Sequence, residues 1–138
     1  PSSWGLLWEG LRDGMLTTPR IGVTRAMADG EVLDVPGRPR AVHLGGHTPG
    51  STAVAFDDRD VIFTGDNLVT LDPYTRRTGP QLMLCGVQAD EHGAAAALDR
   101  LSAEPLGTVL PGHGDPWTAG TRAACEEARQ RHGAVHPH

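Results

Sequence analysis

Apolar and polar residues follow two different periods along this chain, and each period predicts one kind of element. Within residues 3–16, four apolar side chains fall at the i, i+3, i+4, i+7 spacing of one helical face, and Ser2 or Ser3 stands where a helix cap is expected. The four are Trp4, Leu7, Trp8 and Leu11. A helix that packs into the core explains this stripe, and so does a helix that covers a pocket or a partner surface. The pattern leaves both open.

From residue 30 onward, short apolar runs alternate with turn residues, as is typical of β-strands. We expect strands at residues 31–35, 41–44, 51–56, 61–63 and 108–110. The polar residues 57–60 join two of these runs and predict a hairpin. Residues 67–87 show no sustained period and contain several glycines and prolines, so we expect an irregular surface loop there.

Two helices are expected after this loop. In the first, Asp90 stands at the cap position, Pro105 marks the end, and the apolar stripe consists of Ala94, Ala97, Leu98 and Leu101. The second, at residues 119–132, carries small residues on one face and is expected to pack closely on the sheet. The tail, residues 133–138, is expected to fray.

These elements predict a single domain over residues 1–138. It consists of a helical N-terminal segment (1–29), a core (30–117), and a C-terminal helix with its tail (118–138). The expected fold class is α/β in the broad sense and α+β more narrowly, with one mainly antiparallel sheet and flanking helices. A chain of 138 residues is long enough for one modest hydrophobic core.

Composition narrows the classes of partner. The 12 Lys and Arg residues against 17 Asp and Glu give a formal net charge of −5, and no basic run is long enough for a phosphate-binding stripe, so nucleic acid is not an expected partner. No stretch approaches about eighteen consecutive apolar residues, and a signal-peptide pattern is absent, so we expect no membrane association and a cytoplasmic location. Cys85 and Cys125 form no C-x-x-C pair and are expected to be idle thiols.

Three of the apolar runs end in a shared way, with a small residue or proline, then a glycine, then a side chain that can bind a metal. These side chains are His47, Asp66 and His113. Glycine allows a tight turn, so each side chain lies at a strand end near a shared centre if the runs are strands. Imidazole and carboxylate are common zinc ligands. The separations, 66 − 47 = 19 and 113 − 66 = 47 residues, are too long for a local finger, so only the fold could bring them together.

Each of the three residues also has an ordinary structural explanation. His47 could cap a turn, Asp66 could be a turn aspartate, and His113 could lie in a flexible glycine loop. Their occurrence together, in this order, favours a site. His43, four residues before His47, is expected to lie behind the ligands or in the core. The remaining histidines are expected to be solvated, and they are His92, His132, His136 and His138.

The complete motifs, in order, are Gly45-Gly46-His47-Thr48-Pro49-Gly50-Ser51, Thr64-Gly65-Asp66 and Pro111-Gly112-His113-Gly114. Over residues 30–117 this series resembles the C-terminal half of metallo-beta-lactamase-fold hydrolases. The resemblance implies half of an αββα sandwich and a site for two metals, with zinc expected. It implies that His47 completes the ligands of the first metal, that Asp66 bridges the metals as a catalytic ligand, and that His113 binds the second.

Residues beside the three ligands have supporting roles in this interpretation. Thr48 and Ser51 are expected to hydrogen-bond the turn around His47, and Asn67 joins them as a turn residue next to Asp66. Gly45 stands where proline is frequent in the family, a departure that bears on the rigidity of the loop and not on metal binding.

The family's upstream H-x-H-x-D-H metal motif cannot be written from the seven histidines of this sequence. We therefore expect an incomplete half of a metal-dependent hydrolase, inactive alone, whose three ligands can still hold one metal. Asp66 stands where true beta-lactamases use a cysteine thiolate, which favours a thioester, a lactone or a related ester or amide as the small-molecule substrate.

Two other functions stay open. The chain could be a catalytically silent metal-binding or assembly module, or it could work only when paired with a complementary chain that carries the absent motif. The resemblance also implies an apolar sheet face that must be covered. A second copy of the chain, the missing half, or the stripe from Trp4 to Leu11 could cover it.

Overall fold

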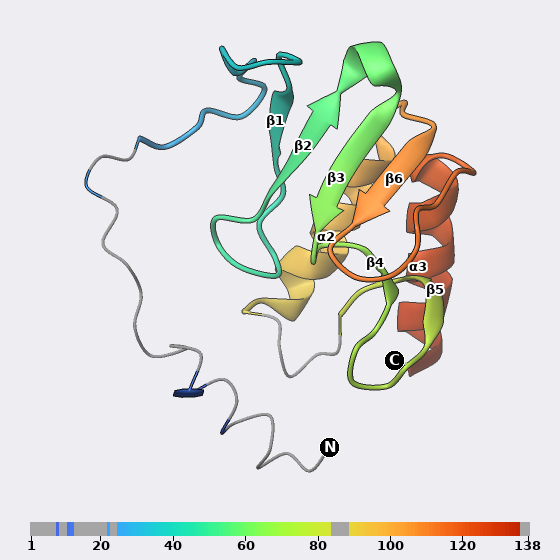
Figure 1. Cartoon of the computed structure of the whole chain (residues 1–138). Coiled ribbons are helices and arrows are strands. Elements are labelled where there is room, and N and C mark those ends of the chain that lie inside the picture. Colours follow the sequence, from blue (N-terminus) through green and yellow to red (C-terminus); the bar gives the residue numbers. More distant parts are fainter. Residues whose placement is uncertain (1–7, 9–10, 13–21, 23–24, 84–88, 136–138) are drawn as a thin grey trace.

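The computed structural model describes residues 8, 11–12, 22, 25–83 and 89–135 (Figure 1). It has a mixed α/β fold with a mainly antiparallel sheet and flanking helices, which confirms the expected fold class. The strands are β1 (Arg40–His43), β2 (Thr52–Phe56), β3 (Val61–Gly65), β4 (Val69–Leu71), β5 (Thr78–Gln81) and β6 (Thr108–Pro111). The helices are the short 3-10 helix η1 (Asp57–Arg59), α2 (Glu91–Ser102) and α3 (Thr121–Val135).

The main sheet has four strands in the order β1-β2-β3-β6. The first three are antiparallel, whereas β6 runs parallel to β3 (Figure 1). In this parallel pair, Ile62 lies beside Val109. A parallel pair needs a long crossover connection, and α2 lies within it. Because parallel strands point the same way, the chain leaves β3 and β6 at the same edge of the sheet.

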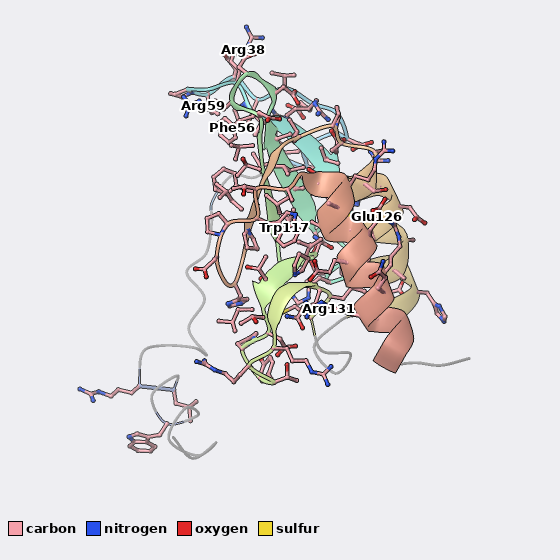
Figure 2. The ribbon with its side chains drawn as sticks, turned by 90° about the vertical axis from the view of Figure 1, so that its right-hand side faces the viewer. Arg38, Phe56, Arg59, Trp117, Glu126 and Arg131 are labelled. Atoms are coloured by element: carbon pink, nitrogen blue, oxygen red, sulfur yellow. The ribbon has the colours of Figure 1, made fainter. Side chains whose placement is uncertain are left out.

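Helices α2 and α3 pack against each other on one face of this sheet, as the side view in Figure 2 shows. The core between helices and sheet is apolar, and it consists mainly of Val42, Ala53, Ala55, Ile62, Val109, Leu98, Leu101, Ala124, Cys125 and Ala128. Ala124 and Ala128 are fully buried, so the small face of α3 does pack closely, as expected. Burial raises the pKa of the Cys125 thiol to about 11, which fits an idle cysteine, while Cys85 lies outside the described residues.

The opposite face of the sheet is only partly covered. Phe63 is 45% exposed there, and Phe56 meets it edge to face at a centroid distance of 5.8 Å. The N-terminal stripe does not shield this face as far as it is described, since Trp8 is 72% and Leu11 42% exposed. Its other members, Trp4 and Leu7, lie outside the described residues.

Two expected elements differ from the structure. Residues 31–35 form no strand and contribute a single bridge from Val32 to Arg40. The turn at Gly37 and Arg38, both at positive φ, follows directly, and a few backbone hydrogen bonds hold residues 30–33 against residues 39–41. Residues 67–87 are not wholly irregular, since β4 and β5 form a second, two-stranded sheet within them. Strands of three and four residues, one of them containing Pro80, are too short to give a periodic signal.

Two smaller features, the connection at residues 57–60 and the start of α2, differ from the expectation only in detail. The connection at residues 57–60 joins two antiparallel strands as expected, but it contains the helical turn η1. Asp90 occupies the N-cap position of α2, although its side chain makes no capping hydrogen bond. In the described part of the chain, no helix is both long and apolar enough to cross a membrane.

Arg40 joins β1 to η1 and to the loop after α2, at the end of the sheet where β1 begins. Its guanidinium group donates hydrogen bonds to Asp57 at 2.8 and 3.0 Å and to Glu104 at 2.7 and 3.3 Å. The Arg40 side chain is 25% and that of Glu104 is 15% exposed, so water shields this network only in part. The Arg40 hydrogen bond lowers the pKa of the Asp57 carboxyl below its ordinary value.

We expect Arg40→Gln to lower the free energy of unfolding by about 1 kcal/mol at neutral pH, as measured by urea denaturation. The pKa of Asp57 is lowered in the folded state, so the contribution of its pair is full above the unfolded value of about 3.9 and is lost as the pH falls below it. The difference between the two proteins should therefore shrink at acid pH. Arg25→Gln is the control, because the Arg25–Glu31 pair is more exposed and its loss should change little.

Candidate metal centre

The Asp66 carboxylate lies between two histidines. Its Oδ2 atom is 3.7 Å from Nε2 of His47, and its Oδ1 atom is 3.6 Å from Nε2 of His113. Each imidazole therefore faces a different oxygen of the same carboxylate. The structure thus brings together all three residues that the glycine-ended apolar runs predict.

The topology of the sheet explains why Asp66 and His113 meet. Asp66 directly follows β3, and only Gly112 separates His113 from the end of β6. Gly65 pairs with Pro111 in the parallel ladder, and the N–H of Gly112 donates to the carbonyl oxygen of Gly65 at 2.9 Å. The two ligand-type residues therefore leave the same edge of the sheet, although 47 residues separate them in the sequence (113 − 66 = 47).

His47 reaches this edge on the loop between β1 and β2. The loop rests on the start of α2, where the N–H groups of Ala89 and Asp90 donate to the carbonyl oxygens of His47 and Gly46, at 3.0 and 3.1 Å. Gly46 has a φ of +81°, and a Cβ atom there would lie 2.6 Å from the Cα atom of Ala94. Only glycine allows this approach, so the position of His47 depends on it.

Gly112 provides the space that the Asp66 carboxylate occupies. A Cβ atom at Gly112 would lie 2.1 Å from Asp66 Oδ1, far inside van der Waals contact. The tight turn expected from the sequence accounts for only part of the role of this glycine. Its second role has no local signal, because the atom that it accommodates comes from a residue 46 positions earlier (112 − 66 = 46).

The supporting residues are arranged as follows. The Thr48 N–H donates to Ser51 Oγ at 2.9 Å, and the two hydroxyls are also 2.9 Å apart, so both hold the turn that follows His47. Asn67 is 3% exposed, and its Oδ1 atom has no hydrogen-bond partner among the described residues. His43 is exposed, and its ring lies 3.4 Å from Thr52 Oγ1, so it is not a core residue.

The other histidines lie away from this group. His92 is exposed on α2, in agreement with the expectation of a solvated side chain. His132 is half-buried on α3, so it is less solvated than expected. His136 and His138 lie outside the described residues.

The donor set fits a pair of metal ions better than one. Two atoms that each lie about 2.1 Å from a zinc ion are at most about 4.2 Å apart, and both His–Asp pairs meet this limit. In the part of the chain that the structure describes, no three His, Cys, Asp or Glu side chains are grouped closely enough to hold a single ion. The expectation that these three ligands alone can hold one metal therefore has no support here. Each ion would receive two donors from the described residues, fewer than the three that a catalytic zinc site uses.

Accessibility also fits a binding site. The side chains of His47, Asp66 and His113 are 19, 32 and 43% exposed, so all three can be reached from solvent. The Nδ1 atom of His47 is buried and has no partner among the described residues. Metal-bound histidines generally donate this second N–H to a neighbouring acceptor, so such an acceptor would have to come from outside the described residues.

Known proteins resemble this chain in sequence and in fold. A sequence model of the metallo-beta-lactamase superfamily matches residues 7–113. Among solved structures, the chain is similar to a metallo-beta-lactamase family protein from Thermus thermophilus, with 25% identity and a TM-score of 0.63 over 97% of this chain and 47% of that one. It is also similar to the protein TTHA1623 in a di-iron-bound form, with 26% identity and a TM-score of 0.53 over 89% of this chain and 59% of that one.

A third similar structure is a beta-lactamase domain protein from Burkholderia ambifaria, with 22% identity and a TM-score of 0.58 over 83% of this chain and 35% of that one. No match was found among curated proteins. The chain thus spans between 35 and 59% of the length of these three solved structures.

We expect Gly112→Ala to destabilise the protein by about 1–3 kcal/mol, because the new methyl group must displace the Asp66 carboxylate or the β6 backbone. Urea denaturation of the metal-free protein measures this loss. Gly50→Ala is the matched control, since a Cβ atom there meets nothing within 4 Å. Equal stability of the two variants would contradict the close approach of Gly112 to Asp66.

Proposed function

This chain belongs to the metallo-beta-lactamase superfamily, and we propose that it forms part of a metal-dependent hydrolase in which Asp66 bridges two metal ions. His47 would bind the first ion together with one carboxylate oxygen, and His113 would bind the second ion together with the other. The observation that carries the proposal is the placement of one imidazole Nε2 at each oxygen of Asp66. Zinc is the metal that we propose, although a similar protein is known in a di-iron-bound form.

Within this function, the residues of the chain have distinct tasks. When bound, such ions lower the pKa of a water ligand toward about 7 and polarise the bond to be cleaved. His47 and His113 would hold the ions together with Asp66, and the glycine-rich loops position both imidazole rings. The partial exposure of these side chains leaves room for a substrate to approach them.

We assign the substrate to the thioesters, lactones or related esters and amides. The support is the carboxylate of Asp66 at the place where true beta-lactamases have a cysteine thiolate. Because the described residues give each ion only two donors, we propose that the chain alone is inactive and that the intact enzyme contains further ligands.

A second candidate function is that of an assembly module without catalysis. It is favoured by the outer face of the main sheet, which is the face opposite α2 and α3. On this face Phe63 is 45% exposed, and Val54 and Leu110 are half-buried. Each 100 Å² of apolar surface removed from water stabilises an interface by about 2.5 kcal/mol. A complementary half of the domain or a second copy of the chain would therefore bind there. The two functions are compatible if the covering partner also supplies the additional ligands.

Zinc binding tests the proposed site. By isothermal titration calorimetry, we expect Asp66→Ala to weaken binding at least about tenfold, since Asp66 belongs to both His–Asp pairs. His47→Ala and His113→Ala should each remove one pair and leave the other. Asp58→Ala is the control, because Asp58 is an exposed aspartate at the other end of the sheet. Equal zinc affinity of all four variants and the unchanged chain would refute the metal site.

Activity is measured on the same proteins with thioester, lactone and beta-lactam substrates and added zinc. Little or no turnover is expected from the chain alone. Robust turnover that Asp66→Ala abolishes would show that no further ligands are needed, and it would overturn the idea of an incomplete half.

Light scattering tests whether a second copy of the chain covers the outer face of the sheet. We expect the unchanged chain to associate and Phe63→Glu to shift it toward the monomer, because a charge on the outer face cannot be buried in an apolar contact. Tyr74→Glu is the control, since Tyr74 is 63% exposed and lies outside the main sheet. A monomeric unchanged chain across the micromolar range would rule out self-association and leave the complementary half as the partner.

A further inference from the structure

The β4–β5 hairpin holds the loop that carries His113. The backbone N–H groups of Thr70 and Leu71 both donate to the carbonyl oxygen of His113, at 2.9 and 3.1 Å. The Thr70 hydroxyl donates to the carbonyl oxygen of Asp115 at 2.6 Å and lies 3.4 Å from that of His113. Thr70 is only 7% exposed, so these bonds are largely shielded from water.

The contact between hairpin and loop leaves no spare room. Gly114 has a φ of +98°, and a Cβ atom there would lie 2.4 Å from Thr70 Oγ1 and 2.6 Å from the backbone nitrogen of Leu71. Glycine is thus needed both for the backbone conformation and for the approach of the loop to β4. The Thr70 hydroxyl occupies the space that a side chain at residue 114 would need, so this contact requires glycine there.

The hairpin is itself anchored on the helix α3. Arg131 donates from Nη1 to the carbonyl oxygen of Thr78 at 2.7 Å and from Nη2 to Glu127 at 2.6 Å. Figure 2 labels Arg131 where α3 meets the hairpin, and Gly79 leaves space for its guanidinium group. One side of the hairpin is therefore held by α3, while the other side holds the His113 loop.

Among the three ligand-type side chains, that of His113 is the most exposed, at 43%, and residues 112–115 are all exposed. The surrounding core therefore does little to fix this ring. The N–H of Gly112 ties the loop to β3 on one side, and Thr70 ties it to β4 on the other.

We propose that Thr70 is a positioning residue for His113: its hydroxyl fixes the His113–Asp115 backbone so that the imidazole faces Asp66 Oδ1. This inference rests on the proposed metal-binding function of the site. It assigns to the hairpin a role in the second ion's site only, because the hydrogen bonds of Thr70 lead to the His113 loop and not to that of His47.

The test uses zinc titrations of the full chain, followed by NMR of the histidine ring nitrogens. In the unchanged chain, the ring signals of both His47 and His113 should shift on zinc binding. In Thr70→Val, the zinc concentration for half of the His113 shift should rise about tenfold, while that for His47 changes less than about twofold. Thr70→Ser keeps the hydroxyl and should restore the His113 response.

Thr121→Val is the matched control. Thr121 is likewise buried, and its hydroxyl donates to the carbonyl oxygen of Leu106 at 2.9 Å, so this variant loses the same kind of bond away from the site. Both histidine responses should then remain unchanged. If Thr70→Val does not fold, Gly114→Ala replaces it. The new methyl group pushes the loop away from an intact Thr70. This variant must then show the same selective loss at His113.

Three results would overturn the inference. The first is an unchanged His113 response in Thr70→Val, and the second is an equal loss at both histidines, which would mark a general loss of structure. The third is a response of Thr70→Ser as weak as that of Thr70→Val. Absence of any zinc-dependent shift at both histidines of the unchanged chain would instead refute the proposed metal site, and the inference with it.

Discussion

The parallel pairing of β3 with β6 is the interaction on which the rest of the structure depends. Ile62 and Val109 are partners in this ladder and are both fully buried beneath the helices. Because the pair is parallel, the residues that follow each strand emerge at one edge, where Asp66 and His113 meet. The small residues of α3, fully buried at Ala124 and Ala128, allow that helix to lie close to the sheet and complete the burial.

Close backbone contacts then determine the geometry at this edge. Gly46 lies against α2, Gly112 lies against Asp66, and Gly114 lies against Thr70, and at each place a Cβ atom would come within about 2.6 Å of a neighbouring atom. The three ligand-type side chains are therefore positioned largely by glycines, which let neighbouring backbone come close. In this respect the three glycines are as much a part of the site as the residues that carry its chemistry.

The further ligands that the proposed function requires have a counterpart in the packing of the sheet. The described residues bury one face of the sheet under α2 and α3 and leave Phe63 exposed on the other. They also offer two donors to each ion of the proposed pair, which is fewer than a catalytic metal needs. The edge that carries Asp66 borders this open face, since Asp66 directly follows β3. One partner could therefore meet both needs, which links the stability of the fold to its function.

The sequence by itself determined the strands β1, β2, β3 and β6, the helices α2 and α3, and the three residues that meet at the sheet edge. Those features depend on local periodicity, on glycine after an apolar run and on motif order, all of which are visible in one dimension. The sequence did not predict the strands β4 and β5, because they are too short for a periodic signal. It also did not predict the contacts of Gly112 and Thr70, because these join residues more than 40 positions apart (112 − 66 = 46; 113 − 70 = 43). Only the tertiary structure decided them, since the space that a carboxylate or a loop requires is defined by whichever distant backbone lies beside it.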